Sequence, residues 1–404
     1  MNTTIEIPTH VPAECVWDHN LAAFLREGDD PFRAASRLHD GPGVIWAPTA
    51  AHGRPAWIFT QHALIEKGFS DWEMFSSKRG ANAVVMDPDW LMLPVEADRP
   101  DHRHYRQVLN PQFTPAAIKR RASAVQDLCD GLIDSFVDRG RCEFVSEFAS
   151  ILPNAIVISL LGLPQHALPQ FLAWEEQTIH GETPEAALAA SQAIINYLKE
   201  HIAAEQARPE ASTDVMQAIL TGRVADRPLN EMEVLGTVFL LFVAGLDTVT
   251  STLGWIMRYL ATDQSLQTRL RDNPQDIPAA IEEFGRAFGV SAPSRTVARD
   301  MVFNGVPMKE GETILLPTML AGRDPRTWDN PHVINIDRRP RHITFGIGPH
   351  VCVGVHLAKR EMKVMLETFL GRMQNIRLPE DGRYEYYTTN TVGIAALDLE
   401  WDPA

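Results

Sequence analysis

Cys352 is the residue of this sequence whose type and setting most favour chemistry. It lies in the glycine-rich segment 345–354, directly before a predicted helix over 355–373. Glycines permit backbone conformations closed to other residues and let a large flat group approach the chain. The amides and the dipole at the start of a helix favour a thiolate over a thiol. Such a thiolate can be a nucleophile or a metal ligand, whereas a lone cysteine is more commonly a buried structural residue.

One functional interpretation is a cysteine–histidine hydrolase. Cys352 would be the nucleophile, and His342 or His350 would be the base. This interpretation leaves a second unusual segment of the chain without a role, so we rank it low.

That second segment is 244–248, which reads Ala-Gly-Leu-Asp-Thr inside a long apolar helix predicted over 230–263. Glycine weakens a helix, and a buried aspartate is costly unless it has a partner. The Thr248 hydroxyl can also compete for the carbonyl group of Ala244 and bend the helix. A kink with a satisfied polar pair would explain the segment, but a local rule broken at the centre of a domain is also typical of function.

The remaining pattern predicts a mostly α-helical fold with minor β structure, formed by a single domain over 1–404 with a flexible segment at about 1–15. Short strands are expected at 44–48 and 56–60 around a turn at His52-Gly53. Thr114 and Thr183 each precede a proline and predict helix starts. The further expected elements are helices at 115–140, 144–162, 184–207 and 276–289, and strands within 301–317 and 386–399.

Composition excludes several classes of function. The 404 residues carry a net charge of −15, which argues against a nucleic-acid or anionic-membrane binder. The four cysteines are scattered, so neither a disulfide framework nor a structural zinc site is expected. The start of the chain lacks the features of a secretory signal, and the apolar run 234–246 is too short to span a bilayer. We therefore expect a cytoplasmic protein.

Four motifs in order resemble the cytochrome P450 family. The segment 345–354 is similar to its haem-binding loop, Glu283–Arg286 to its ExxR signature, 244–248 to its oxygen-activation motif, and 102–106 to its HxxxR helix. Each motif alone is weak, but together they are specific. The resemblance covers the chain from residue 44 onward and is closest to the bacterial camphor hydroxylases. The segment 334–338 departs from the family pattern, so either Arg338 or Arg339 could pair with Glu283.

The resemblance implies a haem b cofactor whose iron is bound by the Cys352 thiolate. A thiolate ligand donates electron density that favours cleavage of the O–O bond. By their positions in the family pattern, four basic residues would bind the two haem propionates. A phenylalanine and a glycine would make further contacts with the haem. These residues are His102, Arg106, Arg295 and His350, together with Phe345 and Gly245.

On the opposite side of the haem, the resemblance gives Thr248 a hydrogen bond to oxygen and Asp247 the relay of protons through water. This acid–alcohol pair favours a monooxygenase that uses dioxygen and inserts one oxygen atom into a C–H bond. A non-catalytic haem-thiolate protein that binds a small ligand is the alternative, and it would need neither residue.

Electrons must come from partner proteins, since the sequence shows no flavin or iron–sulfur segment. The resemblance implies an acidic [2Fe-2S] ferredoxin, a separate flavin-dependent reductase, and a monomer. Arg103, Arg106, Lys359 and Arg360 could form a basic docking face, or the last two could be a solvated helix face.

The family positions also indicate a substrate pocket lined by Trp90, Leu240, Val243, Ser291 and Val392. Most of these residues are apolar, which favours a small cyclic terpenoid. By resemblance, Trp90 takes the place of a tyrosine that binds the camphor ketone. Alternatively, Trp90 only packs within the segment that covers the pocket. The small Ala81 replaces a facing aromatic residue of the family. We therefore expect an ionone-type norisoprenoid rather than camphor, with camphor hydroxylation as the alternative.

Overall fold

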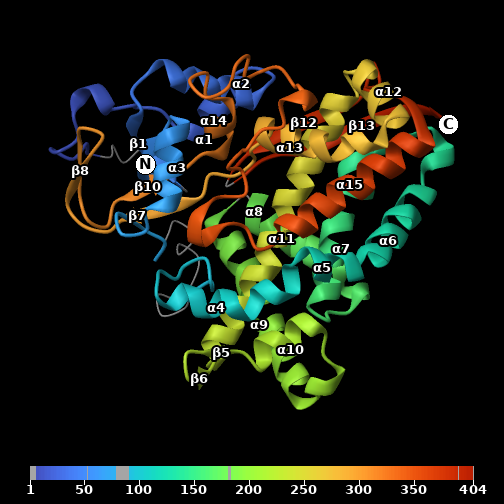
Figure 1. Cartoon of the computed structure of the whole chain (residues 1–404), viewed down its shortest axis with the longest axis horizontal. Coiled ribbons are helices and arrows are strands. Elements are labelled where there is room, and N and C mark those ends of the chain that lie inside the picture. Colours follow the sequence, from blue (N-terminus) through green and yellow to red (C-terminus); the bar gives the residue numbers. More distant parts are fainter. Residues whose placement is uncertain (1–5, 52, 79–90, 181–182, 390, 404) are drawn as a thin grey trace.

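The computed structural model describes residues 6–51, 53–78, 91–180, 183–389 and 391–403. Helices dominate, and a strand-rich region lies to one side of them (Figure 1). The helices are α1 (Leu21–Leu25), α2 (Pro31–Ser36), α3 (His62–Ser70), α4 (Asp101–Leu109), α5 (Pro115–Arg120), α6 (Ala122–Asp134), α7 (Ile151–Leu160), α8 (Leu168–His180), α9 (Pro184–Ala207), α10 (Asp214–Leu220), α11 (Glu231–Leu260), α12 (Gln264–Asp272), α13 (Ile277–Ala287), α14 (Thr318–Arg323) and α15 (Val355–Arg372). This is the mostly α-helical class with minor β structure that the sequence predicts.

The strands form two larger sheets and two small hairpins among the described residues. One sheet has the order β1-β2-β10-β7-β3, in which β2 and β10 run parallel. The other has the order β11-β13-β12, with β4 also paired to β13. Their bounds are β1 (Val44–Ala51), β2 (Arg54–Phe59), β3 (Phe75–Ser76), β4 (Arg141–Glu143), β5 (Arg223–Val224), β6 (Arg227–Pro228), β7 (Ser294–Val297), β8 (Met301–Phe303), β9 (Val306–Met308), β10 (Thr313–Leu315), β11 (Met373–Arg377), β12 (Tyr384–Thr388) and β13 (Val392–Pro403).

The long helix α11 runs through the centre of the molecule (Figure 1). It begins with a capping box, in which Asn230 accepts from the Glu233 amide and Glu233 accepts from the Asn230 amide. The helix continues through 244–248, although the Thr248 hydroxyl donates to the Ala244 carbonyl at 3.1 Å. Its length and composition would allow it to cross a membrane, yet most of its apolar stretch is buried in the protein.

Two expected helices are interrupted. The predicted helix over 115–140 divides at Arg121 into α5 and α6, and Thr114 caps the first of them through the Ala117 amide. The predicted helix over 144–162 begins as a π-helix (Val145–Ala149), because the Ser150 amide bonds to the Val145 carbonyl five residues earlier. The expected helices α9, α11, α13 and α15 and the β1–β2 hairpin are confirmed.

One large hydrophobic cluster joins the helices to the strands. Of the segment expected to be flexible, residues 1–5 lie outside the described part, while Val11 and Cys15 are buried in this cluster. The core therefore includes residues from both ends of the described chain, since Trp401 of β13 is buried in it as well.

Candidate active site

Cys352 ends a tight loop directly before α15. Gly346 and Gly348 adopt the left-handed conformation, with φ of 68° at both, which explains the glycines at these positions. The Cys352 amide donates to the Phe345 carbonyl at 2.8 Å and closes the loop. Burial raises the pKa of the Cys352 thiol, while the Gly354 amide and the Arg106 guanidinium act in the opposite direction. Cys352 is nevertheless an exposed residue, which leaves room for a group to approach it.

Basic side chains converge beside this loop. Arg106 donates to the Val351 carbonyl at 2.6 Å, and the rings of His102 and His350 lie 4.0 Å apart. Arg295 is 4 % exposed, and its hydrogen bond is to the adjacent Ser294 carbonyl at 2.7 Å. Burial lowers the pKa of Arg295 to about 10, and Asp98 offsets this only in part.

The surroundings of His102 and His350 also carry more positive than negative charge. Burial, followed by Arg106, lowers the pKa of His102 to about 4, and its Nε2 has no hydrogen-bond partner among the described residues. Burial and then Arg295 lower the pKa of His350 to about 2, and its Nε2 lies 3.1 Å from the Ser77 hydroxyl. Buried cations and donors need a negative partner. Two carboxylates such as those of haem would supply it, so these residues fit the group.

The Glu283–Arg286 pair of α13 holds the segment 331–338 through the Val333 carbonyl and the Asn335 amide. Both side chains are fully buried, and Arg286 binds both Glu283 oxygens, at 2.8 and 2.9 Å. Arg338 adds a contact to Glu283 at 3.3 Å. Arg339 instead takes a left-handed conformation at the end of a 3-10 turn. The structure therefore assigns the third member of the network to Arg338.

The side of α11 that carries Leu240, Ala244 and Thr248 is less covered than the rest of the helix. Ala244 is exposed, although most residues around it in α11 are buried. Residues four apart lie on one face of a helix, so these three residues share that face. Gly245 allows α7 to pack closely, because a Cβ at this position would lie 2.4 Å from the Val157 side chain. Its contact in the structure is therefore with a helix, and its role in haem binding stays a prediction.

The Asp247 side chain lies on a different side of α11 from Leu240, Ala244 and Thr248. Its carboxylate accepts hydrogen bonds from the hydroxyls of Tyr387, Thr391 and Ser251, the last at 3.0 Å. Thr248 donates to the Ala244 carbonyl rather than to Asp247. The structure thus brings the predicted acid and alcohol next to each other in the chain without a direct hydrogen bond between them.

The sequence analysis did not identify the three hydroxyl groups that hold Asp247. Ser251 lies one helical turn after Asp247, so helix periodicity could have indicated it. Tyr387 and Thr391 lie 140 and 144 residues further along the chain, and no local pattern links them to Asp247.

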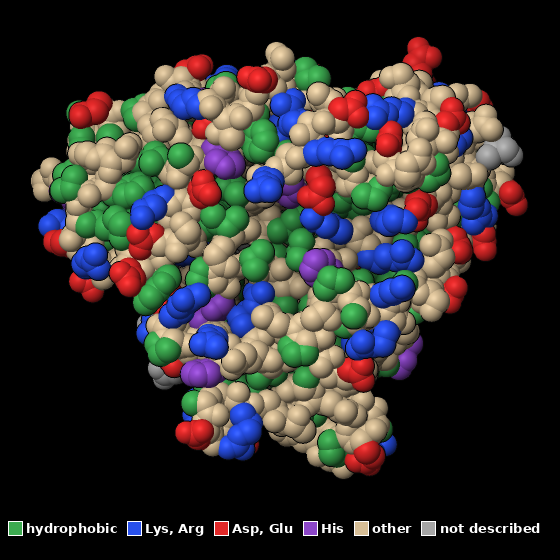
Figure 2. Space-filling view, viewed as in Figure 1, with side chains coloured by type: hydrophobic (Ala, Val, Ile, Leu, Met, Phe, Trp, Pro, Cys, Tyr) green, Lys and Arg blue, Asp and Glu red, His purple; other side chains and the backbone are tan. Residues whose placement is uncertain are grey.

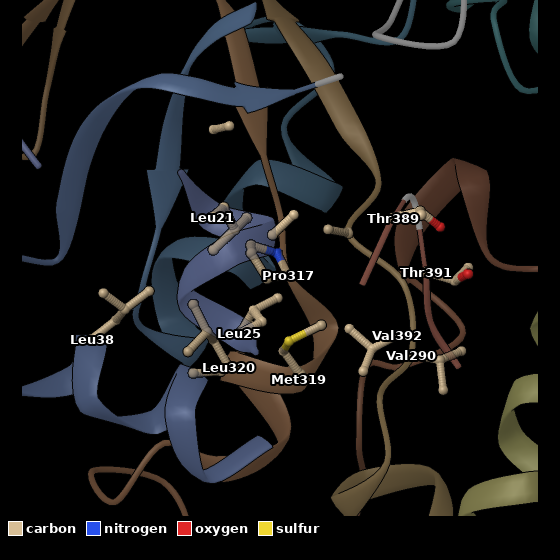
Figure 3. Close-up of a pocket in the computed structure, with 14 residues that line it drawn as sticks. Leu21, Leu25, Leu38, Val290, Pro317, Met319, Leu320, Thr389, Thr391 and Val392 are labelled. Atoms are coloured by element: carbon tan, nitrogen blue, oxygen red, sulfur yellow. The ribbon is translucent and has the colours of Figure 1, made fainter. Parts of the chain in front are cut away.

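A small apolar pocket of about 40 Å³ lies among α1, α14 and the start of β13, and no described residue of α11 lines it (Figure 3). Val392 lines it together with Val290 and Ala292, which flank Ser291. Leu240 and Val243 lie on α11, where both are partly buried. Trp90 and Ala81 fall outside the described residues. The remaining lining residues are mostly apolar and include Leu21, Leu25, Leu38, Pro317, Met319 and Leu320.

The structure gives both candidate bases of a hydrolase other contacts. His342 Nε2 lies 3.3 Å from a Glu282 oxygen, and Lys359 binds the other oxygen of that carboxylate at 2.6 Å. The His350 ring contacts the His102 ring at a tilt of 41°, and its Nε2 lies 3.1 Å from the Ser77 hydroxyl. Phe345 lies with its ring 5.8 Å from the His342 ring, centroid to centroid.

Comparison with known proteins defines the class. The family model described as cytochrome P450 matches residues 165–277 and 277–389. The chain is 31% identical over 408 residues to the "Probable cytochrome P450 127A1" of Sinorhizobium fredii, which covers 98% of this chain and 97% of that protein. It is 29% identical to the "Steroid C26-monooxygenase" of Mycolicibacterium smegmatis, over 82% of this chain and 84% of that one. The solved structure titled "Crystal Structure of Cytochrome P450 CYP101C1" has a TM-score of 0.88 and 30% identity, and covers 98% of this chain and 100% of that one.

The chain belongs to the cytochrome P450 family. It is therefore a monooxygenase of bacterial type with a thiolate-bound haem, and the prediction from the four motifs is confirmed. This finding overturns the hydrolase and the non-catalytic alternatives.

Proposed function

We propose that this monooxygenase hydroxylates a small hydrophobic cyclic terpenoid, with an ionone-type norisoprenoid ketone as the first candidate. The observation that carries the proposal is the less covered face of α11, on which the apolar Leu240 lies with Ala244 and Thr248. Burial of apolar surface contributes roughly 25 cal/mol per Å². Apolar side chains at the predicted positions, such as Leu240, Val243 and Val392, would select a substrate by hydrophobic area and shape, with few hydrogen bonds.

Cys352 would hold the haem iron. His102, Arg106, Arg295 and His350 would bind the propionates, because burial outweighs the charge of Asp98 at His102 and Arg295, and burial together with Arg295 and Arg106 lowers the pKa of His350. Phe345 would contribute to the loop around the thiolate through the hydrogen bond from the Cys352 amide. Haem bound by a thiolate supplies the reductive activation of dioxygen.

The chain's own residues would then position the substrate and deliver protons. Leu240, Val243, Ser291, Val392 and Trp90 would contact the substrate, and Thr248 would present its hydroxyl on the accessible face of α11. Asp247 would supply protons from the opposite side of the same helical turn, through water. Its three hydroxyl partners fix the carboxylate in one orientation.

Electrons would come from a [2Fe-2S] ferredoxin that a flavin-dependent reductase reduces, and the protein would act as a cytoplasmic monomer. Lys and Arg side chains gather around α4 and α15 in Figure 2, on a molecule whose net charge is −15. Arg103 is exposed there, and Arg106 is partly buried. Lys359 is paired with Glu282, which leaves less of its charge for a partner. A local basic face of this kind can guide an acidic protein despite the overall charge.

The test is a titration of the ferric haem protein with camphor and with an ionone, followed through the shift of the Soret band as the haem changes spin state. We expect a large shift with the ionone and a small one with camphor. The reverse result would reject the ionone and place camphor first. No shift with either compound would reject the small cyclic ketone as a substrate class.

A further inference from the structure

A second cavity, of about 100 Å³, lies between α2, the end of α11 and the segment 331–338. α14 packs against both α2 and α13 in the upper part of Figure 1 and brings Arg323 to this cavity. The described residues that line it include none assigned above to haem or to the substrate. One water molecule needs about 10–15 Å³, so the cavity has room for a small ion together with water.

Arg323 presents a buried guanidinium group to this cavity. The residue is 3 % exposed, and its Nε donates to the Ala287 carbonyl at 2.9 Å. No carboxylate of the described residues lies within ion-pair distance of it. Burial lowers the pKa of Arg323 to about 10, and the charge of Asp30 offsets this only in part. A buried cation is costly unless a negative group compensates it, so Arg323 favours an anion in the cavity.

Arg258 supplies a second guanidinium group without an ion pair among the described residues. Its Cζ lies 5.8 Å from the centre of the Trp255 ring and 4.3 Å from that of Tyr384. Its Nε is buried and has no hydrogen-bond partner in the described part of the chain. The Cζ of Arg323 lies 5.1 Å from the centre of the Phe32 ring, which packs edge-on against Trp255 at 4.9 Å. The two guanidinium groups therefore lie over neighbouring rings of one aromatic cluster.

Asp30 is the one carboxylate among the described lining residues, and it is already engaged. One of its oxygens caps α2 by accepting from the Phe32 and Arg33 amides at 2.9 and 3.1 Å. The other oxygen lies 3.6 Å from the Nε of Arg33, an exposed residue. Three arginines against this one aspartate give the lining a net charge of +2. A phosphate group carries up to two negative charges near pH 7 and would balance it.

His332 adds a neutral donor to the lining. The Nη1 of Arg323 lies 3.2 Å from the Nδ1 of His332. A guanidinium group can only donate, so Nδ1 accepts this bond and the ring proton is on Nε2. Burial, followed by the charge of Arg323, lowers the pKa of His332 and keeps its ring neutral at pH 7. His332 therefore brings an Nε2–H donor to the cavity without adding charge.

We propose that this cavity is a second ligand site, which binds a dianionic phosphate group, either as free phosphate or as part of a small molecule. Arg258 and Arg323 supply charge and N–H donors from inside, and Arg33 does so from the exposed edge. Arginine forks match the oxygens of phosphate, which makes these bonds strong and selective. The site goes beyond the proposed hydroxylation and needs neither its substrate nor its electron donor.

The first test is calorimetric titration of the haem-loaded protein with inorganic phosphate at constant ionic strength. Wild type should bind in a saturable manner. Arg258→Gln should bind about 10-fold more weakly or worse, because a charge-assisted hydrogen bond is lost. Arg54→Gln, which removes an exposed arginine of β2, is the control and should match wild type. Equal binding by wild type and Arg258→Gln, or no saturable binding by wild type, would overturn the site.

Asp30→Asn gives a test in the opposite direction, which a damaged fold could not imitate. Asparagine caps a helix as well as aspartate does, so α2 should be retained. The opposing negative charge is removed from the lining, so phosphate should bind more tightly than to wild type. Weaker binding by a folded Asp30→Asn would contradict the charge argument.

Hydrogen exchange and competing anions locate and define the ligand. Phosphate should slow exchange of the amides of 332–334 in wild type and not in Arg258→Gln, and protection confined to other segments would overturn the site. Sulfate, also a dianion, should compete with phosphate, and acetate should not. Equal competition by acetate would overturn the assignment to a dianion. Phenyl phosphate that binds more tightly than phosphate assigns the site to a phosphorylated small molecule, and weaker binding assigns it to the free ion.

Discussion

At the residue scale, the site combines groups whose hydrogen bonds are complete with groups that lack a partner of opposite charge. Glu283 and Arg286 satisfy each other fully, and Arg286 also donates to the Gly322 carbonyl at 2.6 Å. Arg295 and His102 are nearly as deeply buried but face no carboxylate at ion-pair distance among the described residues. A protein tolerates buried basic groups where a ligand supplies the opposite charge. These residues therefore fit the two carboxylates of haem.

Thr248→Ala should separate oxygen consumption from product formation. The hydroxyl on the accessible face of α11 is lost, while the helix is retained because alanine is a good helix former. We expect product per oxygen consumed to fall several-fold and the free energy of unfolding to change by less than about 0.5 kcal/mol. Oxygen uptake and product analysis on the same sample measure the ratio.

Thr250→Ala is the matched control for that variant. Thr250 makes the same type of bond, to the Leu246 carbonyl at 2.8 Å, but it is buried on another side of α11. Its coupling should equal that of wild type. Equal loss in both variants would mean that a threonine hydroxyl supports the helix rather than oxygen activation.

At the scale of elements, the start of α11 is fixed by a charged cluster. Glu233 closes the capping box, binds Arg227 at 2.7 Å and accepts from the Tyr105 hydroxyl at 2.7 Å. Arg227 chiefly lowers the pKa of Glu233, to about 2. Through Tyr105, this cluster also joins α11 to α4, the helix that carries His102 and Arg106. The start of the central helix and the helix that carries part of the proposed propionate site are therefore stabilised together.

Glu233→Gln should lower stability in a pH-dependent manner. The pKa of Glu233 is lower in the folded protein than in the unfolded chain, so its contribution is present above about pH 4.5 and is lost as the pH falls toward about 2. Because Arg227 is exposed and its charge is screened by solvent, we expect a loss of roughly 0.2–1 kcal/mol at pH 7. Denaturant unfolding of both proteins between pH 2 and pH 7 measures it. A difference that stays constant over this range would contradict the assignment.

The elements also show which features sequence reasoning can reach. Capping residues such as Thr114 and Asn230 and the glycine loop before α15 are local signals, and the helices that they predict are present. The break at Arg121 and the π-helix before α7 are not visible in hydrophobic periodicity, because tertiary packing decides them. The choice of Arg338 over Arg339 likewise depends on a backbone conformation that the sequence does not reveal.

The whole molecule is a helical body around α11, and the residues that we propose to bind haem come from distant parts of the chain. His102 comes from α4, Arg295 from β7, and His350 and Cys352 from the loop before α15. A buried guanidinium such as that of Arg295 opposes folding unless an anion compensates its charge. Cofactor binding and the stability of the whole fold are thus coupled.

Removal of haem should therefore lower the stability of the protein. Binding to the folded state alone stabilises it by about 2.7 kcal/mol when the free ligand is at 100 times its Kd. Denaturant unfolding with and without haem should show this gap, and Arg295→Ala should narrow it by weakening propionate binding. Equal stability of the two forms of wild type would show that the basic residues do not depend on the cofactor.

The pairing of α11 with the last strands has a consequence for how the protein is made. Asp247 leaves the ribosome 140 residues before its partner Tyr387. At a synthesis rate of about 5–20 residues per second, this interval lasts roughly 7–28 s. During that time the nascent chain holds a carboxylate whose burial is not yet compensated, so α11 cannot settle into its final place. Final packing of the protein centre is a late event of translation, and the interval is one in which a chaperone can act on the growing chain.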